Sequence, residues 1–285
     1  MDTSTRSITL LHRSPYAFTY VETYGGKAYA VKKFPVYTFG RFDRPLYLGD
    51  GDVRLRSGRE AVDTEIAILT LLENAENVVK IDEVRVGKSE KYPIQIVFRW
   101  AGSSVLVWRE ERYYPSASLL PMYTESELRQ IMRQLLTGVK AIHDAGVIHK
   151  DLKPENILID RKNDRLGNLA ICDFGSASFG DRKFPIIHDA QGTLEFTPPE
   201  ILLHGTGDGV KRDAWSVGVV FFCLLTGRLP WAERTEAAIL RTDIARPASA
   251  TDEVWELLHG LTERDPSHRW SPSHALTSSF IQNAS

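Results

Sequence analysis

The sequence contains only two cysteines, Cys172 and Cys223, and each stands in an apolar stretch. This scarcity argues against a disulfide framework, and we expect reduced thiols in a cytoplasmic or nuclear protein. No apolar run approaches the length of a membrane span, and the first residues lack the basic segment followed by an apolar one that marks a signal peptide. Neither a membrane contact nor secretion is therefore expected.

An excess of charge of one sign is also missing. With 35 basic and 37 acidic residues the formal net charge is −2, which gives no electrostatic reason to expect nucleic acid as a partner. The 42% hydrophobic and 25% charged residues are typical of a soluble globular protein with a substantial core. Because no repeat, low-complexity segment or flexible linker interrupts the 285 residues, we expect one domain over 1–285, with no appended regulatory domain.

The most informative stretch is His149–Asn156, which reads His-Lys-Asp-Leu-Lys-Pro-Glu-Asn and precedes an apolar run. It concentrates polar groups that phosphoryl transfer can use beside a segment expected to be buried. The stretch resembles the catalytic loop of eukaryotic protein kinases, whose pattern is H-R-D-L-x-x-x-N, with Lys150 where arginine is usual. Its Pro-Glu-Asn ending favours the serine/threonine branch of that family.

The resemblance implies a role for each polar residue of the loop. Asp151 would accept the proton of the substrate hydroxyl, Lys153 would neutralise charge on the γ-phosphoryl group, and Asn156 would bind Mg²⁺. Asp173 begins an Asp-Phe-Gly motif 22 residues after Asp151, a spacing that leaves room for one hairpin. It would be the second Mg²⁺ ligand. His149 is assigned to packing and a backbone hydrogen bond.

The N-terminal third has the pattern of a small antiparallel sheet. Residues 8–33 are rich in aromatic and β-branched side chains and contain a Gly25-Gly26 turn, and residues 77–81 and 94–98 are expected to complete the sheet. Ala30-Val31-Lys32 resembles the end of the kinase V-A-I-K strand, in which the lysine pairs with the α- and β-phosphates. The resemblance places these residues at the nucleotide: Ala30, Lys32, Phe98 as gatekeeper, Arg99 and Ala101 through their backbone, and Cys172 at the base of the pocket.

A helix should supply the acidic partner of Lys32. Residues 59–72 carry apolar side chains at helical spacing, and Glu65 is the expected partner, with Glu60 as the alternative one turn earlier. The connection 34–58 is longer than kinases generally have. It is either a loop on the surface or a docking or regulatory insert that influences the position of the helix carrying Glu65.

Glycine is missing where the resemblance requires it. Kinases carry G-x-G-x-x-G in the first hairpin because backbone N–H groups must approach the phosphates, but this chain has no glycine before Gly25. Two registers remain open, one with His12, Ser14 and Ala17 at the glycine positions and one with Ser14, Tyr16 and Thr19. Small residues would keep partial access to the phosphates in the first register, and Pro15 stiffens the turn in either.

The C-terminal two-thirds reads as mainly helical. Thr124–Glu127 is a capping box that opens an amphipathic helix, which Gly146 ends. Asp213 opens an apolar stretch of the length of a buried core helix, and the resemblance implies that it caps the backbone of the catalytic loop. Thr193, in Gly-Thr-Leu-Glu-Phe, would hydrogen-bond Asp151 and Lys153 and marks serine/threonine specificity. Glu200 should pair with Arg269.

The resemblance implies that residues 176–191 form the activation segment, which has only two hydroxyl residues, Ser176 and Ser178, both close to Asp-Phe-Gly. Lys150 keeps the charge of the usual arginine but loses its bidentate fork. We therefore expect weak or no dependence on phosphorylation of this segment, with Asp181 or Asp189 as the anion.

The expected fold is therefore α+β, a bilobal kinase fold. Residues 8–100 form a small antiparallel-sheet lobe with one main helix, and residues 101–285 form a larger, mainly helical lobe. The expected function is a serine/threonine protein kinase using ATP and Mg²⁺ on protein substrates, with a regulatory partner at residues 34–58 or elsewhere on the small lobe. The alternative is a pseudokinase or scaffold that turns over little or no ATP because the first hairpin lacks glycines.

Overall fold

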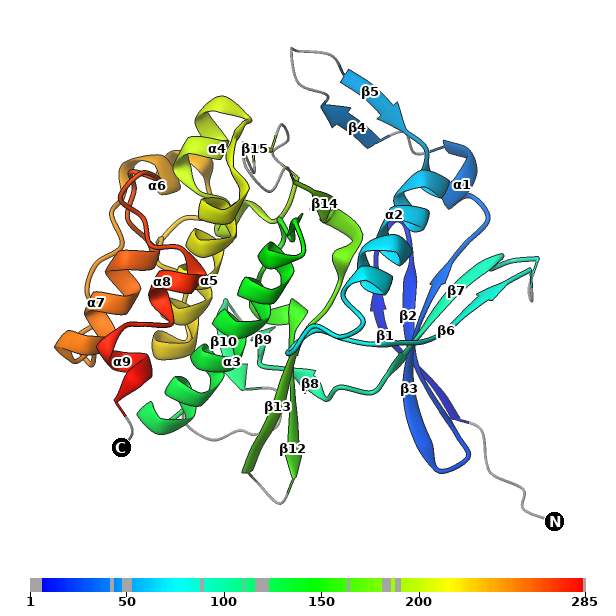
Figure 1. Ribbon diagram of the computed structural model, residues 1–285, viewed down its shortest axis with the longest axis horizontal. Coiled ribbons are helices and arrows are strands. Elements are labelled where there is room, and N and C mark those ends of the chain that lie inside the picture. Colours follow the sequence, from blue (N-terminus) through cyan, green and yellow to red (C-terminus); the bar gives the residue numbers. More distant parts are fainter. Residues whose placement is uncertain are drawn as a thin grey trace. The chain divides into compact units, whose positions relative to one another are not determined.

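The computed structural model describes residues 7–41, 44–47, 53–87, 90–109, 111–115, 123–162, 165–180, 186–187 and 191–283 (Figure 1). The chain divides into two compact units. The first consists of Met1–Asn74 and Val79–Trp100, and the second of Ala75–Val78 and Ala101–Ser285. Antiparallel strands dominate the first unit and helices dominate the second, which is the α+β pattern expected from the sequence.

The first unit is built on a five-stranded antiparallel sheet. The turn between its second and third strands holds Gly25 and Gly26, both with positive φ, as the sequence predicts. The strands follow the order β1 (Ser7–Arg13), β2 (Phe18–Tyr24), β3 (Lys27–Phe34), β7 (Ile94–Arg99) and β6 (Ile81–Val86).

Helix α2 (Gly58–Leu71) packs on this sheet through a shared apolar core (Figure 1). Ser57 and Glu60 form a capping box at its start, which satisfies helix N–H groups and was not predicted from the sequence. The long connection before it contains α1 (Thr38–Arg41) and a hairpin of β4 (Arg44–Tyr47) and β5 (Val53–Arg56). The core comprises Ala17, Phe34, Val62, Ile94 and Ile96.

The prediction that residues 77–81 belong to the small sheet is wrong except at Ile81. Asn77 has φ 55°, a left-handed conformation that interrupts an extended strand. Its side-chain amide donates to the Leu169 carbonyl at 2.9 Å, and Val78 forms a parallel bridge with Ile171. These polar and backbone contacts hold Asn77 and Val78 in the second unit, whereas Val79–Ile81 belong to the first.

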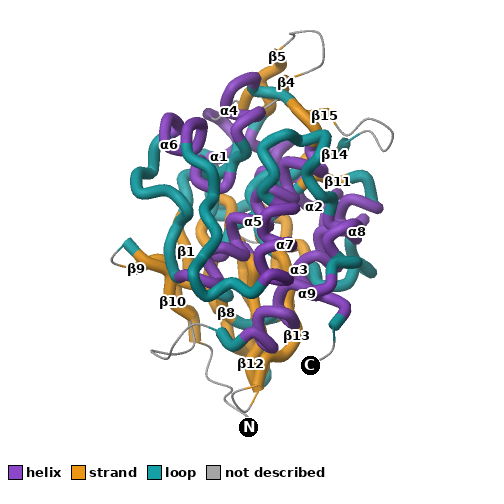
Figure 2. Tube along the Cα trace, turned by 90° about the vertical axis from the view of Figure 1, so that its left-hand side faces the viewer, coloured by secondary structure: helices purple, strands orange, loops and turns teal. Residues whose placement is uncertain are grey.

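The second unit has a helical core around α3 (Glu125–Asp144) and α5 (Gly209–Thr226), which pack together (Figure 2). The predicted capping box at Thr124 and Glu127 is present, and Gly146, with φ 75°, follows the end of α3. Around this core are α4 (Pro199–His204), α6 (Glu236–Arg241), α7 (Asp252–Leu261), α8 (Pro272–Ala275) and α9 (Ser279–Gln282).

Helix α5 begins earlier than expected. Its N-cap is Asp208, whose side chain accepts from the backbone N–H of Lys211, so Asp213 lies one turn inside the helix. Among the helices that the structure describes, none is long and apolar enough to cross a membrane.

Short strands of the second unit frame the catalytic loop. Strands β12 (Ile157–Lys162) and β13 (Arg165–Ile171) form the predicted hairpin, and β8 (Ser103–Ser104) pairs with β12. A further hairpin of β9 (Leu106–Arg109) and β10 (Arg112–Pro115) was not predicted. The remaining strands are β11 (Val147–Ile148), β14 (Ser178–Phe179), β15 (Ile186–Ile187) and β16 (Gly207–Asp208).

Candidate active site

The loop His149–Asn156 connects β11 to β12, and Asp213 of α5 holds its backbone in place. The Asp213 carboxylate accepts the backbone N–H groups of His149 and Lys150, each at 2.9 Å, which confirms the predicted cap. Lys150 has φ 68°, a left-handed conformation in which a residue other than glycine needs such support. The His143 ring, which was not predicted here, lies 2.9 Å from the same carboxylate.

Replacing Asp213 with asparagine is expected to destabilise the fold by about 2 kcal/mol at pH 7, because one buried acceptor is lost. Burial acts to raise the pKa of Asp213, but His143, His149 and the backbone donors outweigh burial and lower the pKa. Its contribution is therefore present above the pKa of an unfolded aspartate and is lost as the pH falls through the lowered folded pKa. Urea unfolding should show the difference between Asp213→Asn and wild type narrowing below about pH 4. A difference that stays constant down to pH 3 would contradict this.

Three side chains converge at the centre of the loop. The Thr193 hydroxyl donates to Asp151 Oδ1 at 2.7 Å, and the Lys153 ammonium donates to Asp151 Oδ2 at 2.9 Å. The same ammonium lies 2.8 Å from the Thr193 hydroxyl. The Asn156 amide donates to the Asp151 carbonyl at 2.8 Å. The Asp151 carboxylate is therefore held in one orientation by donors from two separate segments of the chain.

The ammonium of Lys153 is stabilised in its charged form. Burial alone would lower the pKa of this group, but the carboxylates of Asp151, Glu155 and Asp173 raise it above its usual value. Lys153 therefore remains a cation at any physiological pH. A fixed cation beside Asp151 is suited to a phosphoryl oxygen.

Asn156 and Asp173 flank the two ends of the hairpin formed by β12 and β13. The backbone N–H of Cys172 donates to the Asn156 carbonyl at 2.9 Å, which sets Asn156 beside the residue preceding Asp173. Asp173 is exposed and has φ 61°, and the Asn156 Nδ2 group points to Asp151. Among the described residues, none donates to the Asn156 Oδ1 atom.

This donor set fits Mg²⁺. The ion prefers oxygen ligands and usually takes one or two protein carboxylates together with substrate phosphates and water. Asp173 supplies an exposed carboxylate, and Asn156 supplies an amide oxygen. In the described part of the chain, no group of three or more His, Cys, Asp or Glu residues is arranged to hold a metal ion.

His149 is structural, as predicted. It is fully buried, its Nε2 atom lies 3.1 Å from the Cys172 carbonyl, and its ring contacts Phe174 edge-on at 4.9 Å between centroids. These contacts tie the catalytic loop to the Asp-Phe-Gly segment. Cys172 itself is half-buried and free of any disulfide.

In the first unit, Lys32 of β3 and Glu65 of α2 form the ion pair that the sequence predicts. The Lys32 ammonium lies 2.7 Å from Glu65 Oε1, and the side chains are 14% and 3% exposed. Glu60, the alternative partner, instead accepts the backbone N–H of Ser57 in the helix cap. The low exposure matters because a largely desolvated carboxylate fixes the direction of the ammonium.

Three of the residues predicted to contact adenine, Ala30, Phe98 and Arg99, lie in the same sheet. Ala30 of β3 pairs with Phe98 of β7, and Phe98 is half-buried against the core of the unit. Arg99 is exposed, and its backbone N–H donates to the Lys80 carbonyl at 3.2 Å. Ala101 begins the longer part of the second unit and is half-buried.

The glycine-free turn between β1 and β2 uses its own backbone donors. Strand pairing extends to Arg13 and Phe18, so the turn is Ser14–Ala17. The N–H of Ser14 donates to the Ala17 carbonyl at 2.9 Å, and the N–H groups of Tyr16 and Ala17 point to the Ser14 hydroxyl at 3.3 and 3.0 Å. Pro15 has no N–H to offer. All the N–H groups of this turn are thus occupied within it.

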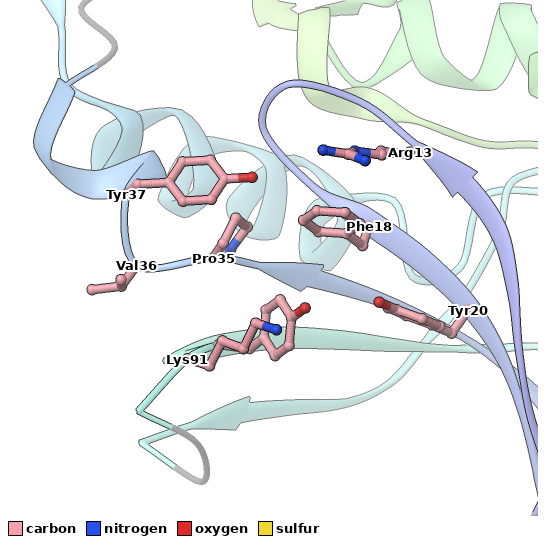
Figure 3. A pocket seen from close by; sticks show the side chains of 8 residues that line it. Arg13, Phe18, Tyr20, Pro35, Val36, Tyr37 and Lys91 are labelled. Carbon is pink, nitrogen blue, oxygen red and sulfur yellow. The ribbon is translucent and has the colours of Figure 1, made fainter.

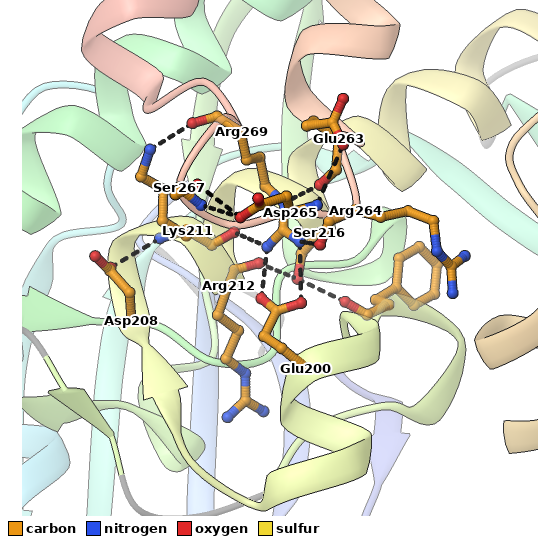
Figure 4. A network of polar contacts seen from close by, with 11 residues as sticks. Glu200, Asp208, Lys211, Arg212, Ser216, Glu263, Arg264, Asp265, Ser267 and Arg269 are labelled. Atoms are coloured by element: carbon orange, nitrogen blue, oxygen red, sulfur yellow. Dashed lines mark hydrogen bonds and ion pairs between the residues drawn. The ribbon is translucent and has the colours of Figure 1, made fainter.

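A buried ion pair ties the end of the 191–200 segment to the helical core (Figure 4). The Arg269 guanidinium binds the Glu200 carboxylate through two bonds, at 2.6 and 3.0 Å, which confirms the predicted pair. Arg269 also donates to the carbonyls of Glu263, Arg264 and Lys211. These bonds therefore link α4, which follows Thr193 in the sequence, to α5 and to the segment between α7 and α8. Asp181 and Asp189, proposed as loop anions, lie outside the described residues.

The first unit also contains a cavity of about 340 Å³ that holds none of the predicted site residues (Figure 3). Aromatic side chains and two cations surround it, and the Arg13 guanidinium lies 5.4 Å from the centre of the Phe18 ring. The lining residues are Arg13, Phe18, Tyr20, Pro35, Val36, Tyr37, Lys91 and Tyr92.

Comparisons with known proteins agree with this geometry. Residues 20–281 match the family model described as the protein kinase domain. The chain is 31% identical over 282 residues to CBL-interacting protein kinase 30 of Oryza sativa subsp. japonica, covering 96% of this chain and 53% of that protein. It is 32% identical over 213 residues to CBL-interacting protein kinase 21 of the same organism, covering 73% and 38%.

A further relative is CBL-interacting serine/threonine-protein kinase 7 of Arabidopsis thaliana. The identity is 30% over 236 residues, which cover 81% of this chain and 52% of that protein. The chain therefore spans about half the length of these curated relatives, or less.

Proposed function

Because the chain belongs to the protein kinase family, we propose that it transfers the γ-phosphoryl group of ATP to serine or threonine hydroxyls of protein substrates. The observation that carries this proposal is the convergence of Thr193 and Lys153 on the Asp151 carboxylate, at 2.7 and 2.9 Å. These are the groups that in-line transfer to a hydroxyl requires: a proton acceptor, a cation for the moving charge, and a residue that orients both.

Asp151 accepts the hydrogen bond of the incoming hydroxyl and then its proton. The two oxygens of its carboxylate are oriented by Thr193 and Lys153, so the carboxylate does not have to reorganise as the reaction proceeds. Lys153 faces the phosphoryl oxygens with its charge. The Thr193 hydroxyl bonds both Asp151 and Lys153, which explains why a small hydroxyl residue occupies this position.

The nucleotide would be held by the residues that the family resemblance assigns to it. Asp173 and Asn156 would hold Mg²⁺, which neutralises phosphate charge when bound. Lys32, aimed by Glu65, would contact the α- and β-phosphates. Ala30, Phe98, Arg99, Ala101 and Cys172 would surround the adenine.

A phosphotransfer assay on a generic protein acceptor tests the proposal. Mg-ATP should give phosphoserine or phosphothreonine, and ATP with Mg²⁺ should raise the thermal midpoint of the chain because a ligand that binds the folded state stabilises it. Absence of both transfer and thermal shift would refute the proposal and favour a scaffold on the same fold.

The closed turn at Ser14–Ala17 is the specific observation in favour of that second function, a binding module with little turnover. Its N–H groups are occupied by Ser14 and Ala17, so they are not available to phosphate oxygens. Moreover, the Thr38 hydroxyl donates to the Tyr16 carbonyl at 2.8 Å, which ties the turn to α1. Weak nucleotide binding is the expected consequence.

Replacing Ser14 with alanine should tighten ATP binding by about threefold to tenfold, because the freed N–H groups of Tyr16 and Ala17 can donate to phosphate. Isothermal calorimetry with Mg-ATP measures the change. Ser14→Gly removes the same hydroxyl and also makes the backbone more flexible. Comparing the two variants therefore separates the effect of freeing the N–H groups from the effect of a more flexible turn. Unchanged or weaker binding in both would show that the turn does not limit affinity.

The segment 34–58 is proposed to bind a regulatory protein. It lies in the sequence between β3, which carries Lys32, and α2, which carries Glu65. A partner bound to this segment would therefore favour or disfavour formation of the Lys32–Glu65 ion pair. The relatives are named for their interaction with CBL, but the chain spans half of their length or less. Replacing residues 42–55 by a glycine–serine linker should preserve basal transfer, and loss of basal transfer would show that the segment supports the chemistry itself.

A further inference from the structure

Two carboxylates flank the proposed reacting centre in the second unit. Glu155 lies in the 3-10 turn Pro154–Asn156, within the catalytic loop, and Glu195 follows Thr193 by two residues. Because Thr193 contacts Asp151, both carboxylates border the surface that a polypeptide must cover when it presents a hydroxyl there. Accessible carboxylates at such a place would select acceptor sequences with basic residues.

Glu195 already has a cationic partner from the chain itself. The Arg234 Nε atom forms an ion pair with Glu195 Oε1, and the guanidinium carbon lies 5.3 Å from the centre of the Trp108 ring. The Glu195 side chain is only 8% exposed, whereas that of Arg234 is 58% exposed. Arg234 thus covers the carboxylate and presents the outer face of the pair.

Glu155 is covered by the β9–β10 hairpin. The Tyr113 hydroxyl lies 3.4 Å from Glu155 Oε1, and the Tyr113 ring packs edge-on against Trp108 at 4.7 Å. The backbone N–H of Tyr113 donates to the Gly227 carbonyl at 2.8 Å, which fastens the hairpin to the end of α5.

Arg234, which covers Glu195, and Tyr113, which covers Glu155, belong to one cluster of side chains. Trp108 contacts both Arg234 and Tyr113, so one hairpin side chain links the cover of Glu195 to the cover of Glu155. We propose that Arg234, supported by Trp108, occupies the acidic subsite beside the acceptor hydroxyl, so that acceptor sequences need no basic residue there. Arg234 is then a specificity-determining residue of the proposed kinase, and this inference rests on the proposed function.

Matched peptides test the proposal. A parent peptide carries one serine among neutral residues, and derivatives carry a single Arg at each of the positions flanking it. For wild type, the ratio of kcat/KM between each Arg peptide and the parent should stay within about threefold, because the subsite is neutralised internally. In Arg234→Gln the ratio should rise about tenfold at one or more positions, where the substrate arginine takes the freed carboxylate.

Two further variants make the assignment specific. Glu195→Gln combined with Arg234→Gln should abolish the gained preference, since the freed acceptor is gone. Arg246→Gln removes another partly exposed arginine, which pairs with Asp252 at 2.7 Å, and should leave the ratios unchanged. A wild-type preference for an Arg peptide above about tenfold, or flat ratios in Arg234→Gln, would overturn the proposal.

Peptide binding separates this inference from the proposed function. Fluorescence anisotropy of the labelled Arg and parent peptides gives Kd ratios that do not depend on transfer. If no peptide is phosphorylated but Arg234→Gln gains preference for an Arg peptide in binding, the kinase assignment fails and the subsite assignment stands. If transfer occurs and neither measurement changes with Arg234, only the subsite assignment fails.

Discussion

Replacing Asp151 with asparagine is expected to lower kcat about 10²- to 10⁴-fold, because the amide cannot take the proton of the attacking hydroxyl. The amide also presents an N–H group to one of the donors that now orient the carboxylate, Thr193 or Lys153. The nucleotide Kd and the thermal midpoint should stay close to wild type, since Asp151 is not a proposed nucleotide contact. Initial rates at saturating ATP, measured together with thermal unfolding, distinguish a loss of kcat from a loss of stability.

A matched control is Asp144→Asn in α3. Asp144 is an exposed aspartate of the same unit, paired with Lys140 at 2.5 Å, and its replacement should leave kcat unchanged. If Asp151→Asn retained more than about a tenth of wild-type kcat, Asp151 would not be the proton acceptor.

Replacing Arg269 with methionine is expected to destabilise the second unit by about 3 kcal/mol, because it leaves the largely desolvated Glu200 carboxylate without its cation. The Arg269 side chain is fully buried, and it makes bonds to Glu200 as well as to several carbonyls. Methionine keeps much of the volume, so the loss is mainly one of charge pairing and hydrogen bonding. Thermal unfolding should show a midpoint lower by about 10 °C.

Arg246→Met provides the comparison for Arg269. Its ion pair with Asp252 is exposed, and such pairs contribute less than about 1 kcal/mol. An effect of Arg269→Met as small as that of Arg246→Met would show that the buried pair does not stabilise the fold. Glu200→Gln should reproduce most of the loss if the pair, rather than the carbonyl contacts, is responsible.

The sequence predicted best those features whose parts are adjacent in the chain or carried by a family motif. The catalytic loop is eight consecutive residues, so its polar groups cannot lie far apart wherever the loop folds. The Asp213 cap and the Glu200–Arg269 pair followed from the resemblance, and their bonds are present. Helix α3 followed from its capping box and periodicity, which are local signals.

The features that the sequence did not predict depend on long-range contacts without a local signal. The Glu195–Arg234 pair joins residues that no periodicity connects, and the Trp108–Tyr113 hairpin has no glycine or asparagine turn to mark it. Residues 78–81 contain three β-branched side chains typical of a strand, but the left-handed Asn77 directs Asn77 and Val78 toward Leu169 and Ile171. In each case tertiary contacts outweighed local preference.

The most direct measurement of the central claim is phosphosite mass spectrometry of a protein acceptor incubated with the purified chain and Mg-ATP. Phosphate should accumulate with time on serine and threonine of the acceptor, and it should be reduced about 10²-fold or more in a parallel reaction with Asp151→Asn. No phosphate with the wild-type chain, or equal phosphate with both proteins, would contradict the assignment of Asp151, Lys153 and Thr193 as the groups that perform the transfer.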